Sequence, residues 1–305
     1  MQLNTNDLIL HPDIHWIKVD DTRLQIRQPN GDNITFDKYA SEINQILNFL
    51  KDPSLDISRL DANLMEELIE LLFAKGFLSS KHTNDNQFNR IAKLSLNNEQ
   101  KYEGSLPRSV AIVGKGILAA IVRTSLQNAK VKINESGNPN ALKIVVADQD
   151  DYHFLSDENK KAIEADQSTL FFRWINGKFR IGPYVVPKDT ACLECAYQRE
   201  LASNLFVDEM RSYMNCSSNN LPTYEGGAVL DNLASALITR QILLILQGYY
   251  RLSGVSTIIT VDPLLFQTTH SPILKLPRCK ICSCNTKRAV RNYRDLIKDS
   301  EVVNS

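Results

Sequence analysis

Two pairs of cysteines are the residues of this sequence whose types and spacing most directly indicate chemistry. Cys192 and Cys195 stand three positions apart in "ACLEC", and Cys279 and Cys282 repeat that spacing in "RCKIC". Two such C-x-x-C hairpins supply four thiolates, a tetrahedral ligand set that Zn²⁺ prefers. Because four protein ligands leave no position open for water or substrate, the pattern predicts a structural zinc ion rather than a catalytic one.

Two further cysteines have weaker patterns. Cys284 follows the second pair and could compete with Cys282 as a ligand, but Cys282 completes the usual spacing. Cys216 lies in the polar stretch "YMNCSSNN", and we interpret it as a loop thiol rather than a nucleophile. A metal held by the four paired cysteines would tie the segment that follows the central sheet to the C-terminal end, and would close a long loop.

A glycine turn is the second candidate site. Gly114 and Gly116 join an apolar run, "VAIV", to an apolar periodic segment, "ILAAIVRTSLQN", and Ala119 stands where a third glycine of a dinucleotide fingerprint would be. Such glycines let a phosphate approach the N-terminus of the helix. Asp148 ends the next buried run, where a carboxylate at the switch point would lie, although capping explains it equally well. The alternative to nucleotide binding is a tight strand-to-helix turn.

Composition restricts the classes of function. The chain has 305 residues, 43% of them hydrophobic, which is enough for two domains. Its 35 basic and 35 acidic residues give a net charge of zero, so bulk charge does not favour a nucleic-acid or membrane partner. No basic segment precedes an apolar run near the start, and no run of 18 apolar residues occurs, which predicts a cytoplasmic protein with reduced thiols.

The elements that must position these residues fall into two expected domains. Residues 1–82 contain three short alternating runs, "HWIKVD", "TRLQIRQ" and "NITFD", followed by two amphipathic segments, the second capped by Asp61. This order predicts a winged helix-turn-helix domain. Residues 83–107 are polar and predict a linker. Residues 108–290 alternate buried strands and helices, which predicts an α/β domain with a parallel sheet, and residues 291–305 are expected to form a tail.

A long apolar segment lies late in the second domain. Residues 226–250, "GGAVLDNLASALITRQILLILQGYY", are apolar on most sides of a helix. A helix of this kind is too apolar for a water-exposed surface, so we expect it in the core or at a subunit interface.

Residues 105–290 resemble the zinc-bearing ThiF-like proteins of azole-forming peptide synthetases. The most specific parts of the resemblance are "GPYVVPKDTACLEC" and the string from His270 to Cys282. The resemblance implies a Rossmann-type ThiF-like domain with a four-cysteine zinc site, which forms homodimers. It also implies a YcaO-type partner that uses ATP to convert Cys, Ser and Thr of a ribosomal precursor into azolines. Whether a flavin-dependent dehydrogenase completes the aromatic ring is left open.

The N-terminal unit resembles the precursor-recognition domain that accompanies this family. There the leader peptide adds as a strand to the edge of the small sheet and lays apolar side chains into a groove, a case of β-augmentation. The resemblance implies an edge strand and a groove wall formed by Ile34, Thr35, Phe36, Leu64, Leu68 and Leu72. The alternatives are that these residues form only a domain core, or that the winged helix binds DNA, which the acidic segment "DANLMEELIELLFAK" disfavours.

One departure from the family's adenylating members bears on activity. Those members resemble one another in an acidic residue after the second strand, an Asn-Arg-Gln segment and a Lys that grip ATP, whereas "VKINESGNPNALK" here is short and lacks the Arg. We therefore expect a noncatalytic, leader-binding subunit of a cyclodehydratase, with ATP on its partner. The alternatives are a stand-alone ThiF-like enzyme that adenylates or dehydrates a peptide carboxylate, and a zinc-stabilised scaffold or regulator.

Overall fold

The chain forms two compact units, residues Met1–Glu99 and Gln100–Ser305. The computed structural model describes residues 8–27, 31, 33–52, 55, 62–75, 77–80, 88, 91–92, 106–134, 138, 140–216, 221–249 and 254–283. The predicted cap Asp61, the possible fifth ligand Cys284 and the predicted tail 291–305 lie outside these residues, as does most of the predicted linker.

The N-terminal unit is built on a three-stranded antiparallel sheet in the order β2-β3-β4, formed by His15–Lys18, Leu24–Arg27 and Asn33–Phe36. Leu24 and Ile26 alternate with polar residues, and this period of two buries both completely on one face of the sheet. Among the described strands, β4 pairs only with β3, so it is the edge strand of this sheet.

The N-terminal unit also contains two helices of described bounds and a second small sheet. They are α1 (Ala40–Lys51), α2 (Ala62–Ala74) and the antiparallel pair β1 (Leu8–Leu10) and β5 (Leu78–Ser80). The apolar faces of both helices join the strands in one buried cluster. Strands followed by helices agree with the expected order of elements, while the winged helix-turn-helix itself stays a prediction.

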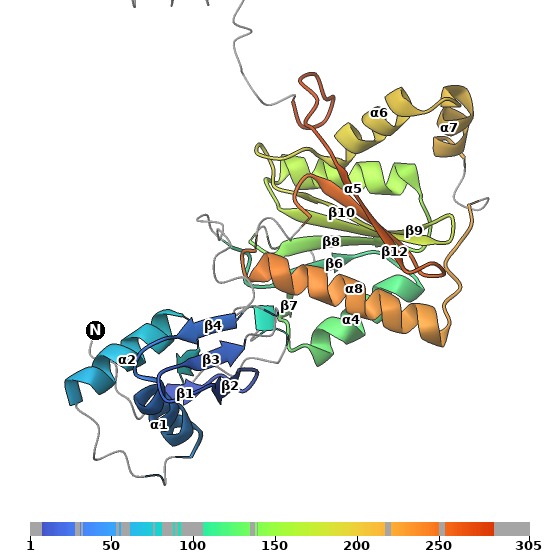
Figure 1. Cartoon of the computed structure of the whole chain (residues 1–305). Coiled ribbons are helices and arrows are strands. Elements are labelled where there is room, and N and C mark those ends of the chain that lie inside the picture. The colour runs from blue at the N-terminus through green and yellow to red at the C-terminus, as the bar shows by residue number, and fades with distance from the viewer. Residues whose placement is uncertain are drawn as a thin grey trace, which may run out of the picture. The chain divides into compact units, whose positions relative to one another are not determined.

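The second unit contains a mixed seven-stranded sheet in the order β12-β11-β10-β9-β8-β6-β7 (Figure 1). Strands β6 (Val110–Val113), β7 (Ile133–Asn134), β8 (Leu142–Ala147) and β9 (Thr169–Ile175) are parallel. Strands β10 (Lys178–Val185), β11 (Thr257–Asp262) and β12 (Gln267–Pro272) extend the sheet antiparallel. The continuous apolar runs of β6 and β8 reflect burial on both faces, as is usual for parallel strands.

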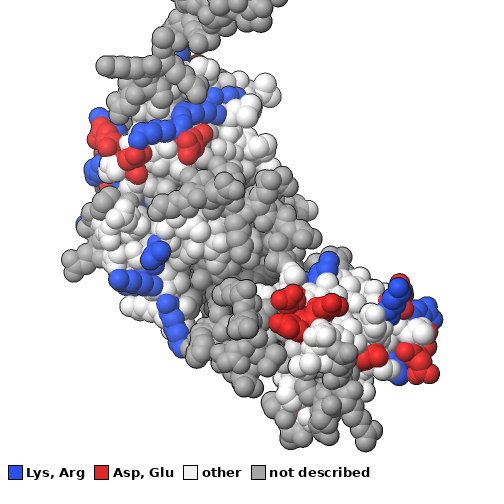
Figure 2. Space-filling model, turned by 90° about the vertical axis from the view of Figure 1, so that its left-hand side faces the viewer, with Lys and Arg blue, Asp and Glu red and all other residues white. Residues whose placement is uncertain are grey.

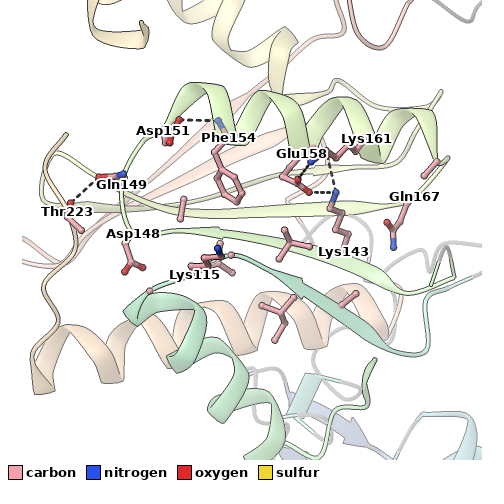
Figure 3. Close-up of a pocket in the computed structure, with 18 residues that line it drawn as sticks. Lys115, Lys143, Asp148, Gln149, Asp151, Phe154, Glu158, Lys161, Gln167 and Thr223 are labelled. Carbon is pink, nitrogen blue, oxygen red and sulfur yellow. Dashed lines mark hydrogen bonds and ion pairs between the residues drawn. The ribbon is translucent and has the colours of Figure 1, made fainter. Parts of the chain in front are cut away.

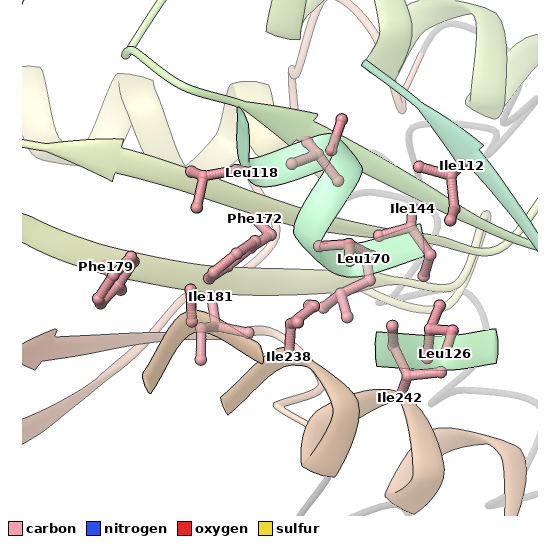
Figure 4. Close-up of a cluster of buried hydrophobic side chains, with 14 of the residues drawn as sticks. Ile112, Leu118, Leu126, Ile144, Leu170, Phe172, Phe179, Ile181, Ile238 and Ile242 are labelled. Atoms are coloured by element: carbon pink, nitrogen blue, oxygen red, sulfur yellow. The ribbon is translucent and has the colours of Figure 1, made fainter. Parts of the chain in front are cut away.

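Helices cover both faces of this sheet. Helices α4 (Ile117–Asn128) and α8 (Ala228–Leu246) lie on one face, whereas α5 (Tyr152–Glu164), α6 (Leu193–Ser203) and α7 (Val207–Met214) lie on the other side (Figure 1). On the first face, Leu118, Ile238 and Ile242 pack with strand residues in the largest described core (Figure 4). The second unit is therefore a three-layer α/β domain, and the predicted mixed α/β class is confirmed.

Helix α8 is long and apolar enough to cross a membrane by length and composition alone. Its most apolar window has a mean hydropathy of 1.5 and is 39% buried. Ala234, Ile238 and Ile242 of this helix are fully buried in the core, while Val229 is 76% exposed. The helix thus supplies a core face and also exposes apolar surface.

Charges of both signs occur on the surface. Lysine and arginine side chains alternate with acidic ones on the face shown in Figure 2, and in that view no continuous basic surface covers the described residues. This distribution agrees with the zero net charge.

Candidate functional site

The four paired cysteines meet in one buried cluster. Cys192 is the N-cap of α6 and Cys195 lies in its first turn, whereas Cys279 and Cys282 lie in the turns that follow β12. Their side chains are buried, and the four Sγ atoms all lie within 4.8 Å of one another. The Sγ of Cys192 is 3.8 Å from that of Cys195 and 3.6 Å from that of Cys279, and Cys195 is 3.6 Å from Cys282.

This cluster has the geometry of a tetrahedral thiolate site. A Zn–S bond of about 2.3 Å places tetrahedral sulfurs about 3.8 Å apart, which is close to the separations found here. The backbone N–H of Leu276 also donates to the Sγ of Cys195 at 3.4 Å. Hydrogen bonds among the four thiols lower the pKa of Cys195 and Cys279, the latter to about 6, and raise the pKa of Cys192 and Cys282. The four cysteines could therefore hold a metal ion such as zinc.

A buried ion pair anchors the helix that carries the first cysteine pair. The Nε of Arg173 on β9 lies 2.7 Å from Asp150 Oδ1, and the Tyr197 hydroxyl on α6 donates to the same oxygen at 3.1 Å. Arg173 is fully buried, and burial raises the pKa of Tyr197. This network holds α6 against the sheet. It was not predicted from the sequence because its three residues are far apart along the chain.

The glycine turn contains a short carboxylate contact. Both oxygens of Asp148 accept hydrogen bonds from the start of α4, from the N–H of Ile117 at 2.7 Å and from that of Leu118 at 2.9 Å. A Cβ on Gly116 would lie 2.1 Å from Asp148 Oδ2, and one on Gly114 would lie 2.2 Å from the carbonyl oxygen of Val146. The two glycines are thus required by contacts within the chain itself. The amides that a phosphate would use already have a carboxylate partner.

A cavity of about 1100 Å³ opens beside this turn (Figure 3). It extends from Lys115 and Asp148 along the sheet to Lys143, Glu158 and Lys161. Glu158 lies 2.7 Å from the Nζ of Lys143 and 2.6 Å from that of Lys161. Burial alone would raise the pKa of Glu158, but these two lysines lower it. Among the cations that line the cavity, Lys115 is the one with no ion pair to another described residue.

A second hollow, of about 500 Å³, lies in the N-terminal unit beside β4. We call it the β4 groove; its lining consists of Thr35, Phe36, Asp37, Lys38, Tyr39, Ile43, Leu64, Glu67, Leu68 and Leu71. Four of the six predicted groove residues are in this lining. Ile34 is half-buried on β4 beside it, and Leu72 is fully buried in the core.

Leu72 of the predicted groove wall is fully buried in the core. The predicted wall follows the line from Leu64 through Leu68 to Leu72 along one face of α2. A helix turns once every 3.6 residues, so that line rotates inward, and Leu71 lines the groove instead. Leu71 is 38% exposed and Tyr39 is 51% exposed, which makes both available to a ligand.

Comparisons with known proteins find likeness in structure and none in sequence. No family model matches the chain, and no curated protein matches it. A heterocyclase in complex with substrate and cofactor matches with a TM-score of 0.69 and 17% identity over 90% of this chain and 39% of that chain. The heterocyclase TruD matches with a TM-score of 0.67 and 18% identity, covering 90% of this chain and 42% of its own.

The microcin enzyme MccB is similar over its whole length. E. coli MccB matches with a TM-score of 0.58 and 15% identity, over 92% of this chain and 98% of that chain. The microcin C7 biosynthetic enzyme MccB in complex with N-formylated MccA matches with a TM-score of 0.57 and 14% identity, over 90% of this chain and 99% of that chain. The chain thus spans about two fifths of the length of these heterocyclases and nearly all of MccB. At such identities the likeness establishes a shared fold.

Proposed function

We propose that this chain is the leader-peptide-binding, noncatalytic subunit of an ATP-dependent peptide cyclodehydratase. The observation that carries the proposal is the free edge of β4 beside an apolar groove. An edge strand offers unpaired backbone N–H and C=O groups to an extended peptide. The groove beside it would accept the side chains of that peptide that point toward α2, and alternate side chains would face water.

The glycine turn supports a role without nucleotide chemistry. Asp148 occupies the amides at the start of α4, and a phosphate placed there would meet its negative charge. Two of the three lysines of the adjacent cavity are paired with Glu158. Few cations remain to neutralise a triphosphate. ATP would therefore bind to a YcaO-type partner, which would form azolines from Cys, Ser and Thr of the precursor.

The remaining features fit the same assignment. The cysteine cluster would hold a structural zinc ion, because its four thiolates fill a tetrahedral shell. The heterocyclases that share this fold are longer chains, and we propose that a separate partner supplies what their additional length contains. The exposed apolar side of α8, including Val229, would form a homodimer interface. A cytoplasmic location would keep the thiols reduced.

Binding of the precursor leader tests the proposal. A fluorescein-labelled leader, from the precursor encoded beside this chain's gene, should bind the full-length protein. Leu71→Glu places a charge in the apolar groove and should weaken binding at least tenfold, about 1.4 kcal/mol. The affinity is read from fluorescence polarisation.

Phe73→Glu is the matched control. Phe73 lies on the same helix, is 42% exposed and is outside the groove lining, so its variant should bind as the unaltered protein does. Equal thermal stability of the two variants would show that both fold. A leader that does not bind, or that binds both variants equally, contradicts the proposed docking site.

A second function is favoured by the large cavity and by the match to MccB. A stand-alone enzyme that adenylates or dehydrates a peptide carboxylate would bind nucleotide in the 1100 Å³ cavity, with Lys115 near the phosphates. One of the matched MccB structures contains ATP. ATP–pyrophosphate exchange by the isolated chain separates this function from the first.

A further inference from the structure

The outer face of α2 carries an acidic cluster. Glu66, Glu67 and Glu70 are exposed, and the helix Ala62–Ala74 contains no Lys or Arg. Figure 2 looks toward this side of the N-terminal unit, where acidic side chains gather. No ion pair joins these three carboxylates to another residue of the described chain. We call Glu66, Glu67 and Glu70 the α2 acidic cluster.

This cluster does not stabilise the helix. Glu66 and Glu70 are four positions apart, and Glu67 and Glu70 are three apart, so like charges are neighbours on the helix surface and repel one another. Nor do they lie in the first turn, where acidic residues favour a helix. A ligand that brings positive charge would relieve this repulsion.

One member of the cluster lines the β4 groove. Glu67 is part of the groove lining, together with the apolar side chains of Leu64, Leu68 and Leu71 from the same helix. The lining also contains Asp37 and Lys38, which offset one another. With Glu67, the groove lining carries a net charge of −1, and Glu66 and Glu70 add negative charge on the same helix.

We infer that the peptide segment that binds the β4 groove is cationic and amphipathic. The inference rests on the proposed leader-binding function and specifies the leader's chemistry. An added strand would place two apolar side chains, two positions apart, against Phe36, Leu68 and Leu71. Lys or Arg residues that flank this apolar pair would lie over the α2 acidic cluster, and their attraction would raise the rate of association as well as the affinity.

Two synthetic peptides test this inference on the full-length protein. Both are labelled with fluorescein and share a strand-favouring sequence with two leucines two positions apart. They differ only in flanking residues, which are Lys in one and Glu in the other. The Lys peptide should bind about fivefold to tenfold more tightly at about 0.05 M salt, and this preference should shrink at about 0.5 M salt, where screening is stronger.

Matched variants assign the preference to the α2 acidic cluster. The triple variant Glu66→Gln, Glu67→Gln, Glu70→Gln should remove the preference. A control variant with the same change in net charge, Asp157→Asn, Glu164→Gln, Glu225→Gln, alters exposed residues of the second unit and should keep it. Equal binding of both peptides to the unaltered protein overturns the charge inference and leaves the groove in place. Binding of neither peptide contradicts the groove itself, and with it the proposed function.

Discussion

At the scale of single residues, the contact between Gly116 and Asp148 decides what the glycine turn can do. The sequence alone allows two interpretations of Gly114, Gly116 and Asp148, which are a nucleotide-binding turn and a capped strand-to-helix turn. Asp148 lies about thirty positions from the amides that it caps, so only the folded chain reveals the contact. The spacing of the glycines predicted which residues form the turn. It did not predict that the Asp148 carboxylate accepts hydrogen bonds from the amides at the start of α4.

Gly116→Ala should destabilise the protein by about 2 to 3 kcal/mol. Gly116 has a φ of 103°, and an added Cβ would lie 2.1 Å from the Asp148 carboxylate. Gly177→Ala is the control, since Gly177 has a φ of 76° and open space around its Cβ position. The Gly177→Ala variant should be less stable by only about 1 kcal/mol, which is the conformational cost of a side chain at positive φ. Chemical denaturation measures both values, and equal losses would contradict the close contact.

At the scale of elements, the four-cysteine cluster joins two segments that are far apart along the chain. The start of α6 supplies Cys192 and Cys195, and the turns after β12 supply the other two ligands. Cys279→Ser should therefore remove bound zinc and lower the melting temperature by about 6 to 12 °C, which corresponds to about 3 kcal/mol for a unit of this size. Plasma mass spectrometry and calorimetry measure the two effects.

Cys216→Ser controls for loss of a thiol. Cys216 is half-buried and outside the four-cysteine cluster, so this variant should keep one zinc ion per chain and change the melting temperature by less than about 3 °C. A Cys279→Ser protein with full zinc content would contradict the four-thiolate site.

Elements with strong patterns could be predicted from the sequence. The runs that became β6, α4, β8 and α8 have the apolar content of a buried strand or a core helix, and the four ligand cysteines follow from their spacing. The antiparallel extension β10-β11-β12 was not predicted, because β12 is exposed along its whole length and has no apolar alternation. Leu64, Leu68, Leu71 and Leu72 share one helical pattern, and which of them faces the groove depends on how α2 packs in the folded unit.

At the scale of the whole molecule, we propose that this chain binds the precursor and that a second protein carries out the ATP-dependent chemistry. This chain presents an edge strand and groove on one unit, and on the other an α/β fold with four clustered cysteines that could hold a metal ion. Its fold spans nearly the whole of MccB and about two fifths of the heterocyclases. A fold shared with both groups does not distinguish a catalytic from a noncatalytic function. A measurement of ATP chemistry is therefore needed to distinguish them.

ATP turnover in the presence of the precursor distinguishes them most directly. Release of phosphate and pyrophosphate, together with ATP–pyrophosphate exchange, is measured for this chain alone, for the proposed YcaO-type partner, and for the mixture. We expect no turnover or exchange by this chain alone and a marked gain when it joins the partner, with one water lost from the precursor for each azoline formed. Exchange or turnover by this chain alone would contradict the account.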